Sequence, residues 1–125
     1  MNLVDSCGWL EYLSDGQNAD FFASPLLKMD ELLVPSICIY EVFRKVLNEH
    51  DELAALDAVA IMYQGTVIEL DATLAIFSAK LGRELNLPMA DSIILASARR
   101  FEAIIWTQDN QFRSIEGVKF IEKKA

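Results

Sequence analysis

The chain has 125 residues, 53% of them hydrophobic, and a formal net charge of −8 from 19 acidic and 11 basic residues. The length suits one domain over residues 1–125, and so much apolar side chain excludes an intrinsically disordered protein. No apolar run approaches the roughly 18–20 residues of a membrane-spanning helix, and Met1–Asp5 lacks the features of a secretory signal, so we expect a cytoplasmic protein with no membrane contact. The negative charge argues against a domain that coats nucleic acid by neutralising phosphates alone.

Short apolar runs alternate with helical patterns, which is typical of a parallel sheet with crossover helices. Asn18 or Asp20 is placed to cap the second helix. The elements predicted for the first half are a strand over 2–4, a helix that stops at Asp15-Gly16, a helix through Phe21 to Leu26, a strand over 32–34, a helix from Pro35-Ser36 to about Glu49 and a helix over 51–63.

The second half begins after Gly65, which breaks the helical pattern. Asp71 is placed to cap a helix, and Pro88 ends that helix and starts the next. The predicted elements are a strand over 66–70, helices over about 72–87 and 90–101, a strand over 103–107, a loop over 108–113 and a strand over 118–121. We therefore predict a three-layer α/β/α sandwich with a parallel sheet of four to five strands.

The cysteines and the single histidine offer little material for catalysis. Cys7 and Cys38 form neither a zinc pattern nor a disulfide framework. A helix start would make the Cys7 thiol more acidic, although a small buried residue is the simpler interpretation. His50 lies at an expected helix end and is interpreted as solvated, so a catalytic triad lacks its base.

Most of the acids have ordinary structural explanations, but the positions of Asp5, Asp91 and Asp109 also suit a binding site. Asp5 and Asp109 each follow a predicted strand, and ligands bind beyond the carboxyl ends of parallel strands. Asp91 falls among apolar side chains in the first turn of its helix, where the helix dipole offsets only about 0.3–1 kcal/mol of the cost of burial. The structural alternatives are an N-cap for Asp5 and an Asx turn for Asp109. Structural roles at helix ends are expected for Asp15, Asp20, Asp51 and Asp71.

If the strands are neighbours, Asp5, Asp91 and Asp109 converge on one rim of the sheet. Like charges held that close cannot all stay ionised without a cation. Ligands that are all oxygen atoms favour Mg²⁺ or Mn²⁺ over zinc. Glu41 lies on the polar face of its helix, where an i,i+4 ion pair with Lys45 is the simpler explanation of its position.

Four segments stand in a recognisable order: Leu3-Val4-Asp5-Ser6, Tyr40-Glu41-Val42, Ala90-Asp91-Ser92-Ile93-Ile94-Leu95-Ala96 and Thr107-Gln108-Asp109-Asn110-Gln111-Phe112. In order and spacing they resemble PIN-domain proteins over essentially the whole chain. The short form resembles the VapC-type toxins of type II toxin–antitoxin pairs. The resemblance implies an endoribonuclease that uses Mg²⁺ or Mn²⁺ to cleave tRNA, rRNA or mRNA, leaving a 5′-phosphate and a 3′-hydroxyl.

The resemblance also implies roles for particular residues. Asp5, Glu41, Asp91 and Asp109 match the acidic quartet that holds the metal and carries catalysis, and Ser6 and Thr107 match the hydroxyl residues that support these acids. It implies a cognate antitoxin as partner, and the apolar excess favours a homodimer. Six basic residues are candidates for contacts with RNA phosphates, although each could equally be an ordinary surface charge: Arg44, Lys45, Arg83, Arg99, Arg100 and Arg113.

Two alternatives stay open at this point. One is a PIN module that binds RNA or protein without cleaving, against which the complete acidic quartet argues. The other is a receiver-type phosphoacceptor domain, which is also small, acidic and Mg²⁺-binding. That domain needs an acid pair after its first strand, whereas Ser6 and Cys7 follow Asp5 here.

Overall fold

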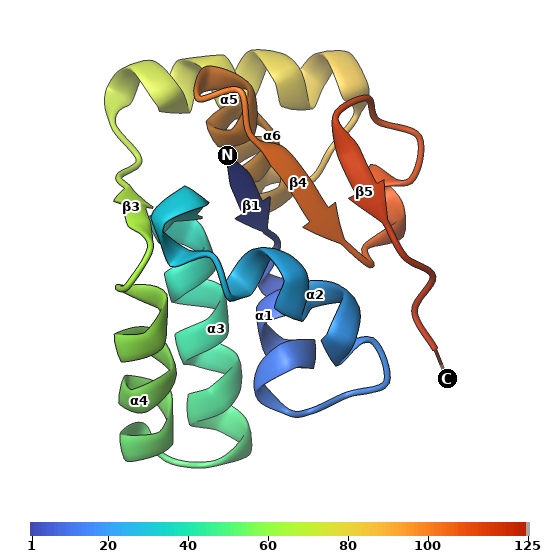
Figure 1. Ribbon diagram of the computed structural model, residues 1–125. Helices are drawn as coiled ribbons and strands as arrows, with labels where there is room; N and C mark the ends of the chain where they lie inside the picture. Colours follow the sequence, from blue (N-terminus) through green and yellow to red (C-terminus); the bar gives the residue numbers. More distant parts are fainter. Residues whose placement is uncertain (125) are drawn as a thin grey trace.

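In the computed structural model, which describes residues 1–124, a five-stranded sheet forms the centre of the protein (Figure 1). The strand order is β3-β2-β1-β4-β5, and every pair of neighbours is parallel. The strands are β1 (Asn2–Val4), β2 (Leu32–Pro35), β3 (Thr66–Ile68), β4 (Ile104–Thr107) and β5 (Val118–Phe120). Because β1 lies between β2 and β4, the chain reverses its direction of winding beside β1, and the carboxyl ends of β1 and β4 are adjacent.

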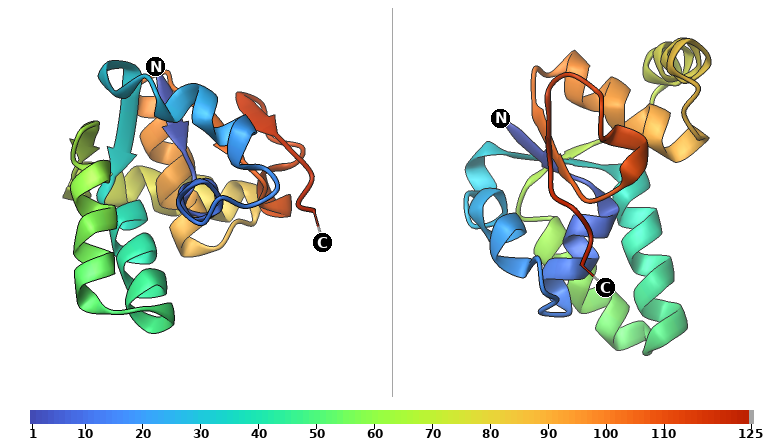
Figure 2. Two further views of the ribbon diagram at one scale, coloured as in Figure 1. Left: turned by 60° about the horizontal axis from the view of Figure 1, so that its bottom comes forward. Right: turned by 90° about the vertical axis from the view of Figure 1, so that its right-hand side faces the viewer.

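Helices cover both faces of the sheet, so the described chain is a three-layer α/β/α sandwich. Helix α2 lies on one face and α6 on the other, while α5 packs against the outer side of α6 (Figure 2). Helices α1, α3 and α4 extend past the carboxyl ends of the strands (Figure 1). None of the helices within residues 1–124 is both long and apolar enough to cross a membrane. The helices are α1 (Ser6–Leu13), α2 (Ala19–Leu26), α3 (Ser36–Glu49), α4 (Glu52–Met62), α5 (Ala72–Leu85) and α6 (Met89–Arg100).

The apolar runs that predicted the central strands are buried on both faces, as expected for a parallel sheet covered by helices. Leu3, Val4 and Val34 have no exposed surface. The first crossover packs closely against this layer, because a Cβ at Gly8 would lie only 2.6 Å from the Phe22 ring. Glycine therefore lets α1 approach α2 and fixes the direction in which the chain leaves β1.

Most predicted elements are confirmed within one to three residues. Asp51 and Asp71 cap α4 and α5, each accepting a backbone N–H at 2.8 Å. The strand predicted over 66–70 ends at Ile68, and the expected loop after β4 contains a short 3-10 helix, η2 (Asn110–Phe112). A second 3-10 helix, η1 (Met29–Glu31), precedes β2.

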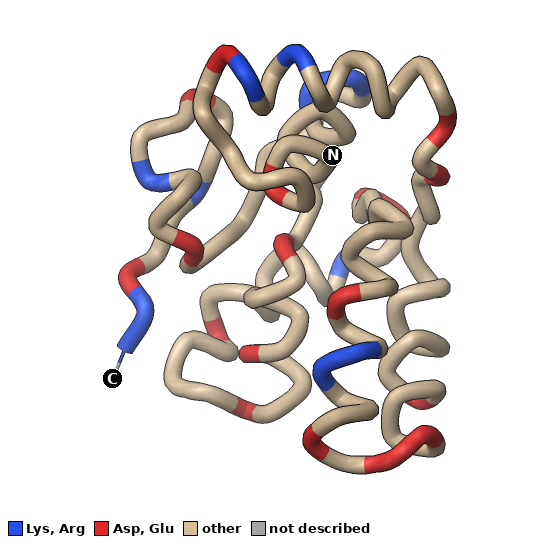
Figure 3. The backbone as a smooth tube through the Cα atoms, turned by 180° about the vertical axis from the view of Figure 1, so that it is seen from behind, with Lys and Arg blue, Asp and Glu red and all other residues tan. Residues whose placement is uncertain are grey.

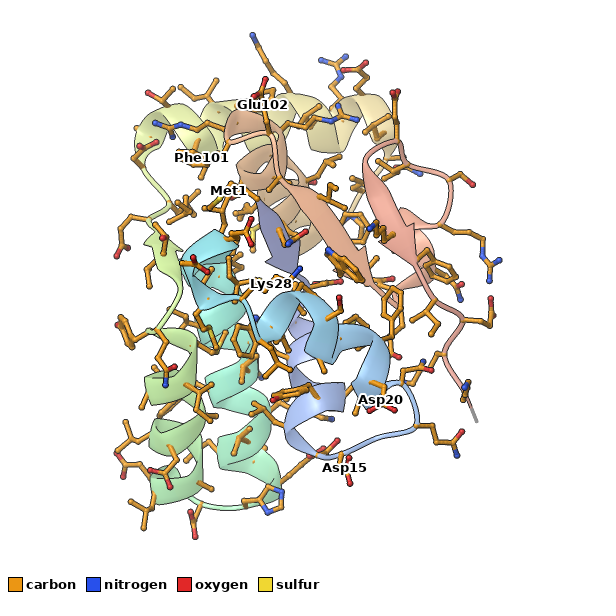
Figure 4. All side chains as sticks on the ribbon, viewed as in Figure 1. Met1, Asp15, Asp20, Lys28, Phe101 and Glu102 are labelled. Carbon is orange, nitrogen blue, oxygen red and sulfur yellow. The ribbon has the colours of Figure 1, made fainter. Side chains whose placement is uncertain are left out.

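The predicted side-chain cap of α2 is wrong. Asn18 occupies the N-cap position but makes no capping bond, because its amide turns across the molecule to other partners. Asp20 lies in the first turn of the helix and is exposed. Asp15 and Asp20 both project away from the sheet at the α1–α2 turn (Figure 4), in keeping with structural roles at helix ends.

Candidate active site

Asp5 stands at the turn between β1 and α1 and is almost completely buried, with 3% of its surface exposed. Its backbone N–H donates to the Trp106 carbonyl at 3.0 Å, which ties the end of β1 to β4. Its Oδ1 accepts the Ser6 N–H at 2.7 Å and caps α1. Its Oδ2 accepts the Thr107 hydroxyl at 2.8 Å. The N-cap expected as the structural alternative is therefore present, but it uses only one of the two carboxylate oxygens.

Three carboxylates converge at the carboxyl edge of the sheet. Asp91 reaches this edge from the first turn of α6, and Asp109 reaches it from the segment after β4. Asp5, Asp91 and Asp109, the acidic triad, each offer an oxygen, and these oxygens lie within 4.8 Å of one another. Asp109 also makes the expected Asx turn, with Oδ1 accepting the Gln111 N–H at 2.9 Å. The sequence-based prediction of a shared rim thus agrees with the geometry.

Glu41 stands beside the acidic triad but outside the group of oxygens within 4.8 Å. Its Oε1 accepts the Ser6 hydroxyl at 2.5 Å, so Ser6 bonds to Asp5 through its backbone and to Glu41 through its side chain. Within the described part of the chain, Glu41 and Lys45 do not form the expected ion pair. Instead Lys45 Nζ lies 2.9 Å from Glu49 Oε1, one turn further along the helix. Glu41 is thereby left facing the site.

Thr107 organises the other side of the site from a position with no exposed surface. Its hydroxyl donates to Asp5 Oδ2 and accepts the Asp109 backbone N–H at 2.9 Å. A single hydroxyl therefore links two members of the triad. Ser6 and Thr107, for which the resemblance implies supporting roles, each donate a hydroxyl hydrogen bond to one of the acids.

The electrostatics of the triad follow from burying like charges together. Burial raises the pKa of Asp5 to about 6, although the hydrogen bonds from Thr107 and Cys7 act in the opposite direction and lower it. Burial raises the pKa of Asp91 to about 7, and the charges of Asp109 and Asp5 add to this effect. Without a counter-ion, the folded protein resists full ionisation of these carboxyls.

The comparisons with known proteins agree with this arrangement. The sequence model of the PIN domain matches residues 3–118, which is most of the chain. The chain belongs to the PIN-domain family. This membership excludes the receiver-type alternative. No curated protein sequence matches this PIN domain closely enough to be informative.

Several solved structures share the fold of this PIN domain at low sequence identity. A toxin–antitoxin complex from Klebsiella pneumoniae has a chain 22% identical, with a TM-score of 0.78 over 95% of this chain and 96% of that chain. PAE2754 from Pyrobaculum aerophilum is 16% identical, with a TM-score of 0.74 over 95% of this chain and 82% of that chain. The sarcin–ricin loop cleaving toxin VapC20 from Mycobacterium tuberculosis is 13% identical, with a TM-score of 0.73 over 93% and 95%.

The donor set of this PIN domain fits a hard divalent cation. The three triad ligands are carboxylate oxygens, which Mg²⁺ and Mn²⁺ prefer, and they come from three different elements. Cys7 adds no competing soft anion, although its Sγ lies 3.4 Å from Asp5 Oδ2. Burial and the Asp5 charge raise the pKa of the Cys7 thiol to about 12, so the more acidic thiol considered from its helix position is wrong.

The basic residues predicted to contact phosphates differ in how they are placed. Lys45 and Arg113 are engaged in ion pairs with Glu49 and Glu122. Arg99 lies in the last turn of α6, about 12 Å along the helix from Asp91 at 1.5 Å per residue. Arg44 donates to the Tyr40 hydroxyl at 3.2 Å but is in no ion pair with a described acid. It is the best placed, because it follows Glu41 by three residues on α3 and is exposed.

Two residues beside the site were not assigned to it from the sequence. Gln108 lies between Thr107 and Asp109 and is 7% exposed, and Asn18 donates to its side chain at 2.8 Å. These residues are 90 positions apart, so no local pattern connects them. The one sequence signal for Gln108 is that its polar side chain directly precedes the candidate acid Asp109.

Proposed function

We propose that this PIN domain is a Mg²⁺- or Mn²⁺-dependent endoribonuclease and the toxin of a type II toxin–antitoxin pair. The observation that carries the proposal is the convergence of the three triad oxygens within 4.8 Å at the carboxyl edge of the sheet. A cluster of acids with only a structural role would gain nothing from this proximity, because each carboxylate raises the cost of ionising the others.

In this proposal Asp5, Asp91 and Asp109 hold the metal and Glu41 completes the site. When bound, the divalent ion lowers the pKa of water and stabilises negative charge on the scissile phosphate. A carboxylate of the quartet accepts the proton of the attacking water, since the only histidine, His50, is exposed at the end of α3. Ser6 and Thr107 fix the orientation of the acids through their hydroxyls, and Arg44 is the first candidate to hold a phosphate.

The solved relatives support the toxin assignment. One is described as part of a toxin–antitoxin complex and another as a toxin that cleaves the sarcin–ricin loop. Others are VapBC complexes from Rickettsia felis and Salmonella typhimurium bound to DNA. Their chains match this one over nearly its whole length, which supports the same use of the fold.

The direct test is expression of this chain in bacteria, alone and together with the product of the gene immediately upstream. We expect growth to stop within a few generations when the chain is expressed alone and to recover with the neighbour. Mapping of RNA 5′ ends should reveal new 5′-phosphate termini at a few positions in the first condition only. Growth arrest with unchanged RNA ends would point to the PIN module that binds without cleaving.

A groove next to the site supports an antitoxin partner. A cavity of about 560 Å³ lies between α1, α3 and α4 and reaches the site at Cys7 and Gln108. Its walls include Leu10, Val46 and Ile61. Its charged lining residues are Glu11, Glu49 and Asp57 against Lys45 and Lys123, and Lys45 is paired with Glu49. Helix α4, which forms one wall, contributes Asp57 and carries no Lys or Arg (Figure 3). An antitoxin segment with apolar and basic side chains is complementary to this wall.

The outer surface of α5 and α6 supports a homodimer. Ile76 and Met89 are 63% and 75% exposed there, so two large apolar side chains face water in the single chain. A hollow of about 540 Å³ lies between the two helices, with Ala75, Ala79 and Gly82 among the residues that line it. Small residues beside prominent apolar ones allow a second copy to pack closely against the same surface.

Light scattering should therefore give about twice the 14.1 kDa mass of one chain. We expect Ile76→Glu to produce a folded monomer. The new carboxylate at position 76 would be buried in the dimer interface without an opposite charge beside it, whereas in the monomer it stays in water. Leu27→Glu is the matched control, since Leu27 is 73% exposed but lies at the end of α2. A wild-type monomer would contradict the homodimer, and a dimeric Ile76→Glu variant would place the interface on another surface.

A further inference from the structure

Asn18 is a buried amide whose hydrogen bonds join three segments that are distant in sequence. Its backbone N–H donates to Glu11 Oε2 at 2.8 Å, within the α1–α2 turn. Its Nδ2 donates to Gln108 Oε1 at 2.8 Å and to the Glu122 carbonyl at 3.1 Å. The residue is 2% exposed, so water does not compete for these bonds. One amide thus links the α1–α2 turn, the segment after β4 and the C-terminal segment.

The Glu122 carbonyl fixes the orientation of this amide. If the amide were turned over, Asn18 Oδ1 would face that carbonyl, and two acceptors would meet without a proton between them. In the observed orientation Oδ1 is buried without a hydrogen-bond partner among the described residues. Both Nδ2 protons are thus directed at acceptors on distant segments, Gln108 and Glu122.

Gln108 connects this amide to the acidic triad. On one side of it, Thr107 bonds to Asp5 and to the Asp109 backbone N–H. On the other side, its own side chain is held by Asn18. Asp109 itself is held by its bond to the Gln111 N–H. The chain just before it is held at two further points, one at Thr107 within the site and one at Gln108 outside it.

Asp109 needs such a restraint because its carboxylate lies within 4.8 Å of two others. Like charges at this distance repel one another, and a connecting segment that is free to move would carry Asp109 outward. We propose that Asn18 is a positioning residue that holds Asp109 in its metal-binding position through Gln108. This inference rests on the proposed function, since the position of Asp109 matters only if the triad binds a metal.

The test measures Mn²⁺ affinity by calorimetry, without RNA, in a double-mutant cycle of Asn18→Ala and Asp109→Asn. We expect Asn18→Ala to weaken Mn²⁺ binding about 10-fold, the lower end of the usual loss when a partner of a metal ligand is removed. In the Asp109→Asn background, Asn18→Ala should change the affinity less than about 2-fold, because the carboxylate that it positions is gone. Ser78→Ala is the control, since it removes another buried hydrogen bond, to the Leu74 carbonyl, within α5, a helix that carries no member of the triad.

A second variant protects the test against misfolding of Asn18→Ala. Gln108→Met keeps the length of the side chain but removes the acceptor for Asn18, so it should lower the Mn²⁺ affinity to the same degree. Equal losses with and without the Asp109 carboxylate, or no loss in a folded variant, would overturn the positioning role. The proposed function would then stand as long as wild-type binding depends on Asp5. A wild-type protein that binds no Mn²⁺ would overturn both.

Discussion

Asp5→Asn and Asp91→Asn should each abolish metal-dependent RNA cleavage and the growth arrest that follows from it, while leaving the fold intact. Each change removes a negative charge from the triad but keeps the size of the side chain. A bound divalent ion contributes several kcal/mol of charge stabilisation, so we expect cleavage to fall by about 1,000-fold or more. The measurement is cleavage of total RNA by the purified protein in Mg²⁺ or Mn²⁺, together with growth after induction.

The stability of these variants separates loss of function from loss of structure. Asn at position 5 still accepts the Ser6 N–H that caps α1, but its Nδ2 stands where Asp5 accepts the Thr107 hydroxyl. Loss of that one hydrogen bond costs about 1 kcal/mol, less than the several kcal/mol of burying the Asp5 charge. At pH 8 without metal, the melting temperature of Asp5→Asn should therefore be no lower than that of wild type. Asp20→Asn is the matched control, because Asp20 is an exposed acid in the first turn of α2 and belongs to no part of the triad. Full activity in Asp5→Asn or Asp91→Asn would contradict the site assignment.

The sequence contains enough information for the fold and for most of the triad. Strands such as β1 and β4 are short apolar runs bounded by polar residues, and helix starts such as Asp51 and Asp71 carry their own capping side chains. These features are local, so periodicity and capping rules find them. The convergence of Asp5 and Asp109 follows from one further rule, that the carboxyl ends of neighbouring parallel strands share an edge.

The missed features depend on contacts between residues far apart in the chain. Asn18 has the residue type and the position of a cap, but its amide bonds to Gln108 instead. Glu41 and Lys45 have the spacing of an ion pair, yet Glu41 accepts the Ser6 hydroxyl and Lys45 takes Glu49. For Asn18 and Glu41 a local interaction, about 1 kcal/mol for the cap and a few tenths for the ion pair, gives way to a tertiary hydrogen bond. Lys45 has an equivalent local partner in Glu49, and helical spacing alone cannot rank these alternatives.

The pH dependence of stability gives the second large expected effect. The pKa of Asp5 is raised from 3.8 to about 6 in the folded protein, which corresponds to about 3 kcal/mol, and that of Asp91 is raised to about 7. The folded state therefore holds these protons more tightly than the unfolded state. Their contribution to stability is complete below about pH 4 and is lost as the pH rises through 6 and 7. Above pH 7 the metal-free protein contains charges that repel one another and have no counter-ion.

A divalent cation should reverse this loss, because it binds the ionised carboxylates of the folded state and competes with protons for them. We expect millimolar Mn²⁺ to leave the melting temperature nearly unchanged at pH 5 and to raise it by roughly 10 °C at pH 8, with the midpoint of the increase between pH 6 and 7. In Asp5→Asn the increase should be smaller and its midpoint should move, since one of the competing protons is gone. Equal shifts at pH 5 and pH 8 in the wild-type protein would show that Mn²⁺ binds elsewhere. At pH 5 the buried carboxyls are protonated, so a site made of them binds Mn²⁺ more weakly there than at pH 8.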